Sequence, residues 1–511
     1  MQRSYSFASL LRSKTMVKIV FLTCLAGTTQ QARASQRTND LLIKLTDTKA
    51  VQQFATLAMA NGKSQVEVLE SNNLVRVQLS DEQLNDLSID DIRQNPSVVY
   101  VQPNYKIRLL ENYRSNDPAV IKMALAKKKK KAPSDQLSPE EALARKDNPE
   151  IPIQKNGGNG ADTHFKQQWG MNDIGVKAGW SKTRGNKIIV AVIDTGVDYT
   201  HEDLMNNLWR NSGEMGLDAN GKDKSSNGID DDGNGYIDDS IGWDFVTDDN
   251  KPYDLSMDPI DVILKGGNPG HGTHCAGNVA AVADNGKGIA GVAPEAQIMA
   301  LRFLGEKGEG DTFGAIKAID YAVKMGAKVL SNSWGSEGED PNDQQGNQAL
   351  KDAITSAENA GVLFIAAAGN GHNGQGYNND SDSRPAYPAS YDHESIISVA
   401  AIDKTDKLGS FSNWGLKTVD IAAPGVQVFS TMVGNKYSDT VVDLYGIKAT
   451  WDGTSMATPH VAGAAALYWS ANPNANWRDV KEAIMSSAKS VSALQGKVVT
   501  GGKLNVENLM K

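Results

Sequence analysis

The chain has 511 residues, 22% of which are charged, and a formal net charge of −9 at pH 7. This length allows about three domain-sized units, and an acidic chain without a dominant basic face is not expected to bind nucleic acid. The sequence contains two cysteines, Cys24 and Cys275. If a leader containing Cys24 is removed, the remaining thiol cannot form an intrachain disulfide, so bound cations become the candidate for extra stabilisation.

Residues 1–34 have the pattern of a secretory signal peptide. Basic residues precede the apolar run 19–26, and Ala32-Arg33-Ala34 provides the small residues of a cleavage site. The run is too short to cross a bilayer. We therefore expect a secreted protein, extracellular, periplasmic or at the cell surface, without stable membrane association. Lipidation of Cys24 is the alternative, although the residues before it are not the small ones expected there.

Residues 35–110 have the element pattern of a small α+β domain. Strands are expected over 41–45, 66–69, 74–79 and 97–101, with helices over 48–60 and 80–93. This β-α-β-β-α-β order is the split βαβ arrangement. The next segment, 111–160, contains a lysine run, five prolines and a Gly-Gly-Asn-Gly sequence. Such a composition predicts an exposed linker.

From residue 161 to the end of the chain, apolar strands alternate with helical segments. A continuous apolar run, typical of a strand buried on both faces, occurs at 188–193, and similar, largely apolar runs occur at 298–304, 329–331, 362–366 and 396–401. Helical patterns fall between several of them, as at 313–325 and 348–360. This alternation predicts that residues 161–511 form an α/β domain, in which a parallel β-sheet is flanked by helices.

Four polar residues stand at the boundaries of these elements. Asp194 directly follows the first buried strand, where open α/β sheets place ligands. His271 lies between glycines near a predicted helix start, Asn370 follows another buried strand, and Ser455 precedes a small apolar helix. Each could be an ordinary turn or capping residue. Together they supply the nucleophile, base, orienting acid and oxyanion donor of serine catalysis.

A second histidine, His274, follows His271 by one helical turn. We expect it to be a core residue with a backbone partner. The alternative is a metal site formed by both histidines, but the pair lacks the glutamate of the zinc-protease helix motif. A zinc hydrolase and a catalytically inactive peptide-binding protein are therefore the competing hypotheses.

Four stretches carry a resemblance to a known family. They are Val-Ile-Asp-Thr-Gly-Val-Asp at 192–198, His-Gly-Thr-His at 271–274, Ala-Gly-Asn at 368–370 and Gly-Thr-Ser-Met-Ala-Thr-Pro at 453–459. In this order they resemble the signature blocks of the subtilisin-like serine proteases, and the match covers roughly residues 165–510. Any one block alone would be weak evidence, whereas the four together are specific.

The resemblance implies a role for each of the four polar residues. Asp194 would orient His271, and His271 would take the proton from Ser455, the nucleophile. The Asn370 amide and the Ser455 backbone N–H would hold the oxyanion. The protein would then be a serine endopeptidase that acts on proteins and peptides as a monomer.

The resemblance also places the substrate and the N-terminal domain. An extended peptide would pair with two edge segments and reach an open main pocket suited to bulky apolar or aromatic side chains. The implied residues are Gly308, Glu309, Gly310, Ser333, Trp334, Gly335, Ala367 and Gly369. Glu309 would favour basic residues further along. Residues 35–110 resemble an inhibitory propeptide, so we expect an inactive precursor that processes itself; an independent folding module is the alternative.

The segment 218–261 contains thirteen aspartates against three lysines. It includes the sequence D-x-[DN]-x-[DN]-G from residue 230, the opening of a calcium loop, although Ile241 stands where the closing glutamate should be. The expected Ca²⁺ ligands are Asp230, Asp232, Asn234, Tyr236, Asp238 and Asp239. The resemblance suggests a second Ca²⁺ position at Asp203, Asp284 and Asn285. A solvated acidic loop is the alternative for the first group.

Overall fold

The computed structural model describes most of the chain from residue 37 onward. The described ranges are 37–60, 65–78, 92–111, 113–115, 117–128, 161–337, 346–372, 374–444 and 447–511. They form two compact units: the described part of Met1–Lys106 with Asp340–Asp352, and the described part of Ile107–Glu339 with Ala353–Lys511. The predicted signal peptide lies outside the described residues.

The first unit contains a small antiparallel sheet. Its elements are β1 Arg37–Leu45, α3 Thr48–Ala60, β2 Gln65–Leu69, β3 Leu74–Gln78 and the first part of β4 Val98–Leu109. The strand order is β4-β1-β3-β2. Alternate residues of β1, including Leu41 and Ile43, pack with Val51 and Phe54 of α3 in one apolar core. These elements match the expected split βαβ pattern; the expected helix at 80–93 falls mostly outside the described residues.

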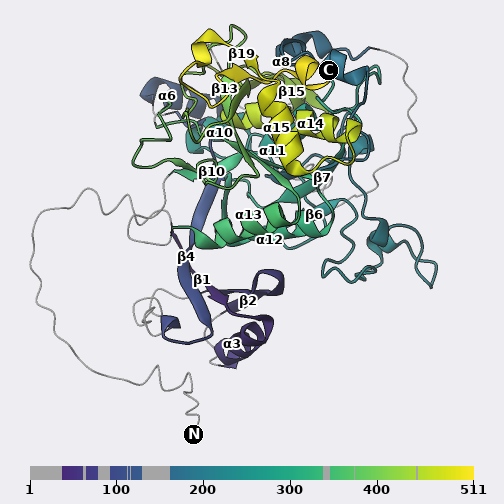
Figure 1. Cartoon of the computed structure of the whole chain (residues 1–511), viewed down its shortest axis with the longest axis vertical. Coiled ribbons are helices and arrows are strands. Elements are labelled where there is room, and N and C mark those ends of the chain that lie inside the picture. The colour runs from purple at the N-terminus through teal and green to yellow at the C-terminus, as the bar shows by residue number, and fades with distance from the viewer. Residues whose placement is uncertain are drawn as a thin grey trace, which may run out of the picture. The chain divides into compact units, whose positions relative to one another are not determined.

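The second unit contains a nine-stranded sheet among its described residues (Figure 1). In spatial order its strands are β19 Lys489–Ser490, β20 Gly502–Lys503, β14 Ile421–Pro424, β13 Ile396–Ile402, β11 Leu363–Ala367, β9 Val329–Asn332, β5 Ile189–Asp194, β7 Gln297–Arg302 and β6 Gly242–Asp244. Every neighbouring pair is parallel except β19 with β20. The predicted parallel α/β sheet is therefore confirmed.

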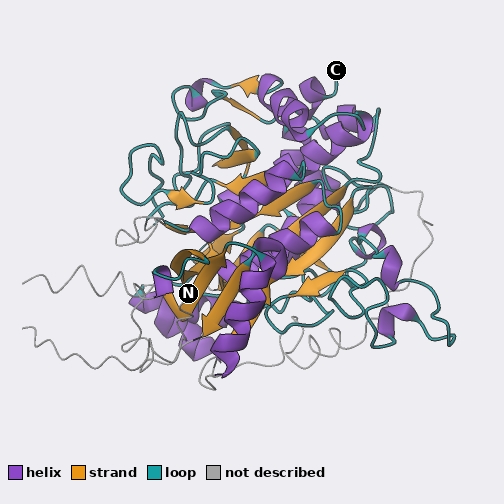
Figure 2. Ribbon diagram, turned by 60° about the horizontal axis from the view of Figure 1, so that its bottom comes forward, coloured by secondary structure: helices purple, strands orange, loops and turns teal. Residues whose placement is uncertain are grey.

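The remaining elements of the second unit surround this sheet. The helices are α6 Pro118–Lys128, α8 Trp169–Asp173, α9 Val176–Trp180, α10 Pro259–Lys265, α11 His271–Ala280, α12 Thr312–Lys324, α14 Thr454–Ala471, α15 Trp477–Ser486 and α16 Val506–Leu509, together with residues 353–359 of α13 Gln348–Asn359, whose first turn belongs to the first unit. The outer strands are β8 Glu309–Asp311, β10 Trp334–Glu337, β12 Ala386–Tyr387, β15 Ser430–Met432, β16 Lys436–Ser438, β17 Thr440–Leu444 and β18 Ile447–Thr450. The ribbon in Figure 2 shows helices packed against the strands.

The long apolar helix α14 packs closely because its residues are small. A Cβ atom on Gly463 would lie 2.6 Å from the Cβ of Val292, so glycine is required at this contact. β13 is buried along its whole length, as its largely apolar sequence predicts. No helix in the described residues combines the length and apolar character that a bilayer span requires.

Strand direction brings the predicted catalytic residues to one edge of the sheet. β5 ends at Asp194 and β11 ends shortly before Asn370. The carboxyl ends of parallel strands meet at the same edge, where open α/β folds bind ligands. α11 begins with His271, and Ser455 lies in the first turn of α14.

Candidate active site

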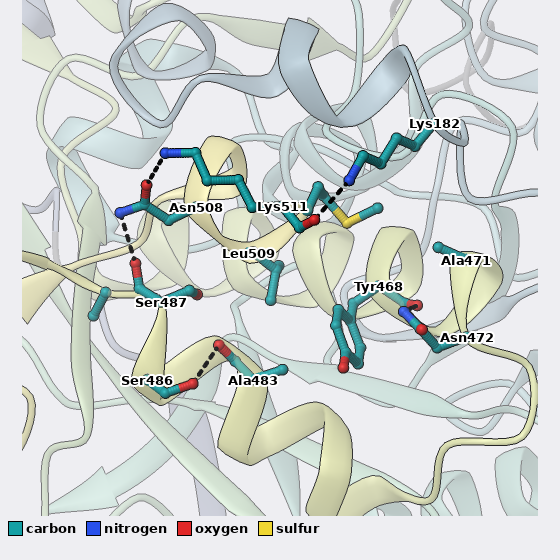
Figure 3. A pocket seen from close by; sticks show the side chains of 12 residues that line it. Lys182, Tyr468, Ala471, Asn472, Ala483, Ser486, Ser487, Asn508, Leu509 and Lys511 are labelled. Carbon is teal, nitrogen blue, oxygen red and sulfur yellow. Dashed lines mark hydrogen bonds between the residues drawn. The ribbon is translucent and has the colours of Figure 1, made fainter.

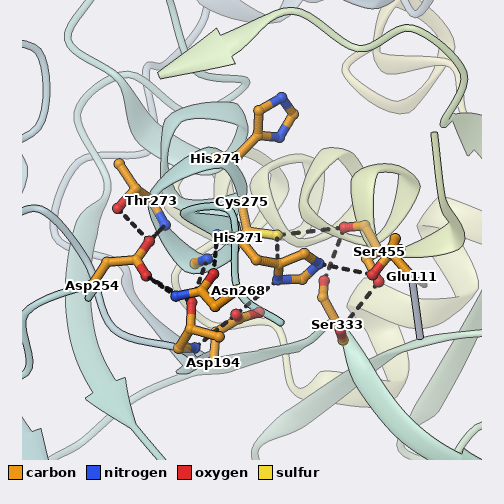
Figure 4. A network of polar contacts seen from close by, with 12 residues as sticks. Glu111, Asp194, Asp254, Asn268, His271, Thr273, His274, Cys275, Ser333 and Ser455 are labelled. Carbon is orange, nitrogen blue, oxygen red and sulfur yellow. Dashed lines mark hydrogen bonds and ion pairs between the residues drawn. The ribbon is translucent and has the colours of Figure 1, made fainter. Parts of the chain in front are cut away.

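Asp194 and His271 form a buried hydrogen-bonded pair (Figure 4). The imidazole Nδ1–H donates to Asp194 Oδ1 at 2.8 Å, and both side chains are at most 1% exposed. The same carboxylate oxygen accepts the N–H of Thr195 at 2.7 Å. A Cβ on Gly272 would lie 2.1 Å from the carbonyl oxygen of Gly196, so this glycine lets the start of α11 approach the loop after β5.

Asp254 is hydrogen-bonded to residues next to Asp194 and His271. Its buried carboxylate accepts hydrogen bonds from Thr195 Oγ1 at 3.0 Å and from Asn268 Nδ2 at 2.6 Å. It also accepts the N–H and hydroxyl of Thr273 at 2.9 and 2.6 Å. Asn268 in turn accepts the backbone N–H of His271 at 2.8 Å. Asp254 thus ties the segment after β5 to both sides of His271; sequence reasoning counted it only as one charge in an acidic stretch.

Ser455 and Asn370 lie at the start of α14. Ser455 Oγ donates to the carbonyl oxygen of Ser333 at 3.1 Å. Asn370 Oδ1 accepts both the N–H and the hydroxyl of Thr454, at 2.8 and 2.9 Å. Because its oxygen is held in this way, the Asn370 amide nitrogen is directed toward the catalytic centre.

A carboxylate from the segment after β4 lies between these groups. Glu111, whose side chain is 2% exposed, places Oε2 3.1 Å from His271 Nε2 in an ion-pair contact. Its Oε1 accepts the Asn370 Nδ2–H at 2.9 Å, and the Ser455 side chain is within hydrogen-bonding reach of the same carboxylate. Sequence reasoning missed Glu111 because it stands at the first position of the expected linker and belongs to no motif.

The electrostatics of this centre follow from burial and close charges. Burial alone would lower the pKa of His271, but the charges of Asp194 and Glu111 raise it well above its ordinary value. Burial would raise the pKa of Glu111, but the attraction of His271 outweighs it and leaves that pKa below its ordinary value. The two residues therefore form an imidazolium–carboxylate pair. An imidazolium cannot accept the proton of a serine hydroxyl.

The chain before Glu111 lies against both predicted substrate segments. Leu109 N–H donates to the carbonyl oxygen of Gly308 at 2.9 Å, and β8 pairs with β4. On the other side, Leu109 stands opposite Trp334 and Arg108 opposite Gly335 in an antiparallel register. Residues 108 and 109 therefore occupy the position expected for an extended peptide.

The other predicted substrate residues have different surroundings. Glu309 is exposed, and Ala367 is buried at the end of β11. A Cβ on Gly369 would lie 2.4 Å from Asn413 Nδ2. Packing against Asn413, rather than an open pocket, therefore requires the small residue at 369.

The segment predicted to be an exposed linker is packed in its described part. Tyr113 contacts Trp451 edge to face, with ring centroids 6.0 Å apart. The N–H of Ser115 donates to the carbonyl oxygen of Ile263 at 2.9 Å, and Ala124 of α6 belongs to the apolar core. The apolar residues of α6 explain the difference, since the prediction rested on the lysines and prolines that follow them. Residues 129–160 lie outside the described residues.

Two other residues of α11, His274 and Cys275, are buried among structural contacts. His274 Nε2–H donates to the carbonyl oxygen of Val428 at 3.0 Å, and its ring stacks on Trp451 at 4.2 Å. Burial lowers the pKa of His274 well below its ordinary value, so it is a neutral core histidine. Cys275 Sγ lies 3.6 Å from the carbonyl oxygen of Ser455, and burial raises the pKa of its thiol to about 11.

A cluster of carboxylates at the acidic stretch could hold a metal ion. Glu214, Asp232 and Asp239 each place one oxygen within 4.8 Å of the others. Glu214 and Asp239 are fully buried, and within the described part of the chain Glu214 Oε2 has no hydrogen-bond partner. Burial raises the pKa of Asp239 to about 6. Buried oxygen ligands of this kind fit Ca²⁺, a hard cation that takes carboxylates.

The other ligands predicted for this ion have different partners. Asp230 accepts the backbone N–H of Gly235 at 2.8 Å, and both oxygens of Asp238 accept that of Gly228 at 3.1 Å. Asn234 Nδ2 donates to Asp239 at 2.9 Å, and the ring of Tyr236 packs edge to face on aromatic neighbours. Backbone N–H groups of the loop thus donate hydrogen bonds to carboxylates that the calcium-loop motif had assigned as Ca²⁺ ligands. Glu214 was missed because it precedes the acidic run.

The second predicted cation position is only partly assembled. Asp203 is fully buried and accepts Asn285 Nδ2–H at 2.6 Å. Asp162, which was not predicted, accepts the N–H of Asn285 at 3.2 Å. Burial, with the nearby charge of Asp162, raises the pKa of Asp203 to about 6. Asp284 instead forms an ion pair with Arg184 at 3.0 Å.

A pocket of about 680 Å³ lies at the C-terminal helices, away from these residues (Figure 3). Its lining includes Lys182, Tyr468, Asn472 and Lys511. Lys182 Nζ donates to the backbone carbonyl oxygen of Lys511 at 3.1 Å. None of the predicted site residues lines this pocket.

Comparison with known proteins decides the family. The sequence signature described as "Subtilase family" matches residues 185–504. The chain belongs to the subtilase family. It is a subtilisin-like serine endopeptidase, and the matched range contains all four residues placed at the edge of the sheet.

Relatives of this subtilase match about two thirds of its chain or more. A "Thermophilic serine proteinase" of Bacillus sp. (strain AK1) is 34% identical over 349 residues, which is 68% of each chain. "Thermitase" of Thermoactinomyces vulgaris is 35% identical over 332 residues, 65% of this subtilase and 92% of thermitase. Fervidolysin from Fervidobacterium pennivorans, described as a keratinolytic enzyme related to subtilisin, matches with a TM-score of 0.63 at 25% identity, over 100% of this chain and 65% of fervidolysin.

Proposed function

We propose that this subtilase cleaves peptide bonds with Asp194, His271 and Ser455 as its catalytic triad. The observation that carries the assignment is the convergence of His271, Ser455 and the Asn370 amide on one carboxylate, with His271 tied to Asp194 at 2.8 Å. A negatively charged oxygen bound at this point imitates the oxyanion that forms during acyl transfer.

In the proposed reaction His271 Nε2 takes the proton of Ser455 Oγ as the oxygen attacks the scissile carbonyl carbon. Asp194 stabilises the imidazolium that results. The Asn370 Nδ2–H and the backbone N–H of Ser455 bind the oxyanion. The imidazolium then protonates the leaving amine, and the same base activates water for hydrolysis of the acyl-enzyme.

We further propose that substrates bind as extended peptides between the segments 308–310 and 333–335. The antiparallel pairing of residues 108 and 109 with β10 supports this mode of binding. The side chain of Leu110 lies beside Gly335, since a Cβ atom built on Gly335 would be 3.3 Å from Leu110 Cδ2. An apolar side chain in contact with this segment supports the proposed preference for apolar side chains. The exposed carboxylate of Glu309 would favour basic residues nearby.

Export and activation complete the proposal. The leader at 1–34 would direct secretion, the N-terminal unit and residues 107–111 would keep the precursor inactive, and the enzyme would remove them itself. Ca²⁺ bound at Glu214, Asp232 and Asp239, and near Asp203, would stabilise the fold by neutralising buried carboxylates.

The experiment compares wild-type precursor with Ser455→Ala during expression in a secreting host. N-terminal sequencing should find that the wild type loses its first 110–160 residues and that Ser455→Ala keeps them. A fluorophosphonate probe should label the wild type at Ser455, with excess Ca²⁺ present throughout. Equal processing of both chains would show that another protease matures the precursor, and absence of label would contradict the triad.

A further inference from the structure

The side chain of Glu111 is held in place from both directions along the chain. Before it, the Leu109 N–H donates to Gly308 at 2.9 Å. After it, Tyr113 packs on Trp451 and the Ser115 N–H donates to Ile263. With its side chain 2% exposed, Glu111 is fixed at the proposed catalytic centre by the packing of its neighbours as well as by its own contacts.

The carboxylate meets each group that the reaction would use. Oε2 lies 3.1 Å from His271 Nε2, and Oε1 accepts the Asn370 Nδ2–H at 2.9 Å. A Cβ on Gly453 would lie 2.0 Å from Oε1, so the carboxylate rests directly on the backbone that starts α14. The N-terminus of an 18-residue helix favours a negative charge at that position.

This arrangement blocks catalysis for two chemical reasons. The imidazole nitrogen that must accept the serine proton is already paired with a negative charge. The oxyanion donor Asn370 is also occupied, and a carboxylate is a poor electrophile that Ser455 cannot cleave. We propose that Glu111 is the inhibitory residue of the precursor, and that its side-chain carboxylate occupies the place of the substrate's oxyanion.

The inference rests on the proposed precursor and goes beyond it. A segment that lies in the substrate groove is cleaved when its scissile carbonyl oxygen binds the oxyanion donors, the Asn370 amide and the Ser455 N–H. It stays intact only if another group occupies these donors. Here the Glu111 carboxylate would have to leave before any backbone carbonyl could bind Asn370. Inhibition and self-processing therefore compete for the same donors, and weakening the Glu111 contacts should release the active site while the chain is still intact.

The test measures how fast a fluorophosphonate probe labels Ser455 in full-length precursor, before processing. Glu111→Gln keeps the size of the side chain but removes the charge that pairs with His271. Hydrogen bonds to charged groups contribute enough for an expected increase in labelling rate of about tenfold or more. Lys122→Gln is the control, since Lys122 is an exposed charged residue of α6 and lies outside the predicted substrate-binding segments, and it should label at the wild-type rate.

Equal labelling of wild-type and Glu111→Gln precursors would overturn the inference. A second measurement does not depend on folding of the variant: a synthetic peptide of residues 106–117 should inhibit mature wild-type enzyme about tenfold more strongly with Glu at 111 than with Gln. Equal inhibition by the two peptides would also overturn it. If mature enzyme itself takes no label, the proposed function fails instead.

Discussion

Asp254 is hydrogen-bonded to residues on both sides of the proposed catalytic pair, Asp194 and His271. It accepts hydrogen bonds from residues on both sides of the Asp194–His271 contact, yet it does not touch the reacting atoms itself. Under the proposed function we expect it to act as a positioning residue, whose effect appears in the rate of the chemical step. Small displacements of catalytic groups reduce rates strongly because reaction requires close alignment.

We expect Asp254→Asn to lower kcat by about tenfold to a hundredfold while KM changes little. The substitution replaces one carboxylate oxygen, which accepts hydrogen bonds, with an amide nitrogen, which donates them. The variant side chain therefore cannot accept the hydrogen bonds of Thr195, Asn268 and Thr273 together. Steady-state kinetics of mature enzyme on a peptide substrate measure the effect. Thr195→Ser, which keeps the hydroxyl that Asp254 binds, is the control and should retain most of kcat, whereas Thr195→Val should not. A change confined to KM would argue against a positioning role.

At the scale of elements, the long connection between β5 and α11 contains a buried group of negative charges. Glu214 and Asp239 are fully buried in it, and close carboxylates repel one another unless a proton or a cation compensates. The loop is therefore expected to gain stability from Ca²⁺. Sequence motifs located the loop, but the residues that face one another were decided by how its turns fold.

We expect removal of Ca²⁺ by a chelator to lower Tm, and Glu214→Gln to reduce this calcium-dependent shift. A ligand at a hundred times its Kd stabilises a fold by about 2.7 kcal/mol. Calorimetry of the Ser455→Ala chain, which cannot digest itself under the proposed function, measures the shift with and without calcium. Asp218→Asn, in the same stretch but outside the cluster of Glu214, Asp232 and Asp239, should keep the full shift. If the Glu214→Gln chain also keeps the full calcium-dependent shift in Tm, the stabilising calcium does not bind at Glu214.

At the scale of the whole molecule, the sequence predicted the frame of the enzyme well. Apolar runs such as that of β13 are recognisable because both faces of the strand are buried, and the ends of those strands identified Asp194 and Asn370. Glu111, Asp254 and Glu214 were not predicted. Each reaches its site through the folding of its own segment and tertiary packing, and no local pattern of residue types marks such a contact.

Buried carboxylates also affect how the stability of the whole fold depends on pH. Burial raises the pKa of Asp254 from 3.8 to about 6, so the folded state holds this proton more tightly than the unfolded state does. This contribution to the free energy of unfolding is fully present below the pKa that Asp254 has in the unfolded state. It is lost as the pH rises through the pKa that Asp254 has in the folded state. Between about pH 4 and pH 6, Asp254 should therefore reduce the free energy of unfolding as the pH increases.

We expect the Ser455→Ala chain to lose at most about 3 kcal/mol relative to its Asp254→Asn derivative across this pH range. Taking the difference removes the contributions of the other buried acids, which both chains share. Urea unfolding at several pH values measures it. Asp218→Asn provides the contrast: backbone hydrogen bonds, above all from Lys222, lower the pKa of Asp218, so its effect falls below pH 4 and the difference should stay flat above it. A flat difference for Asp254→Asn as well would mean that its carboxylate is ionised throughout, and that the hydrogen bonds from Thr195, Asn268 and Thr273 outweigh the cost of burial.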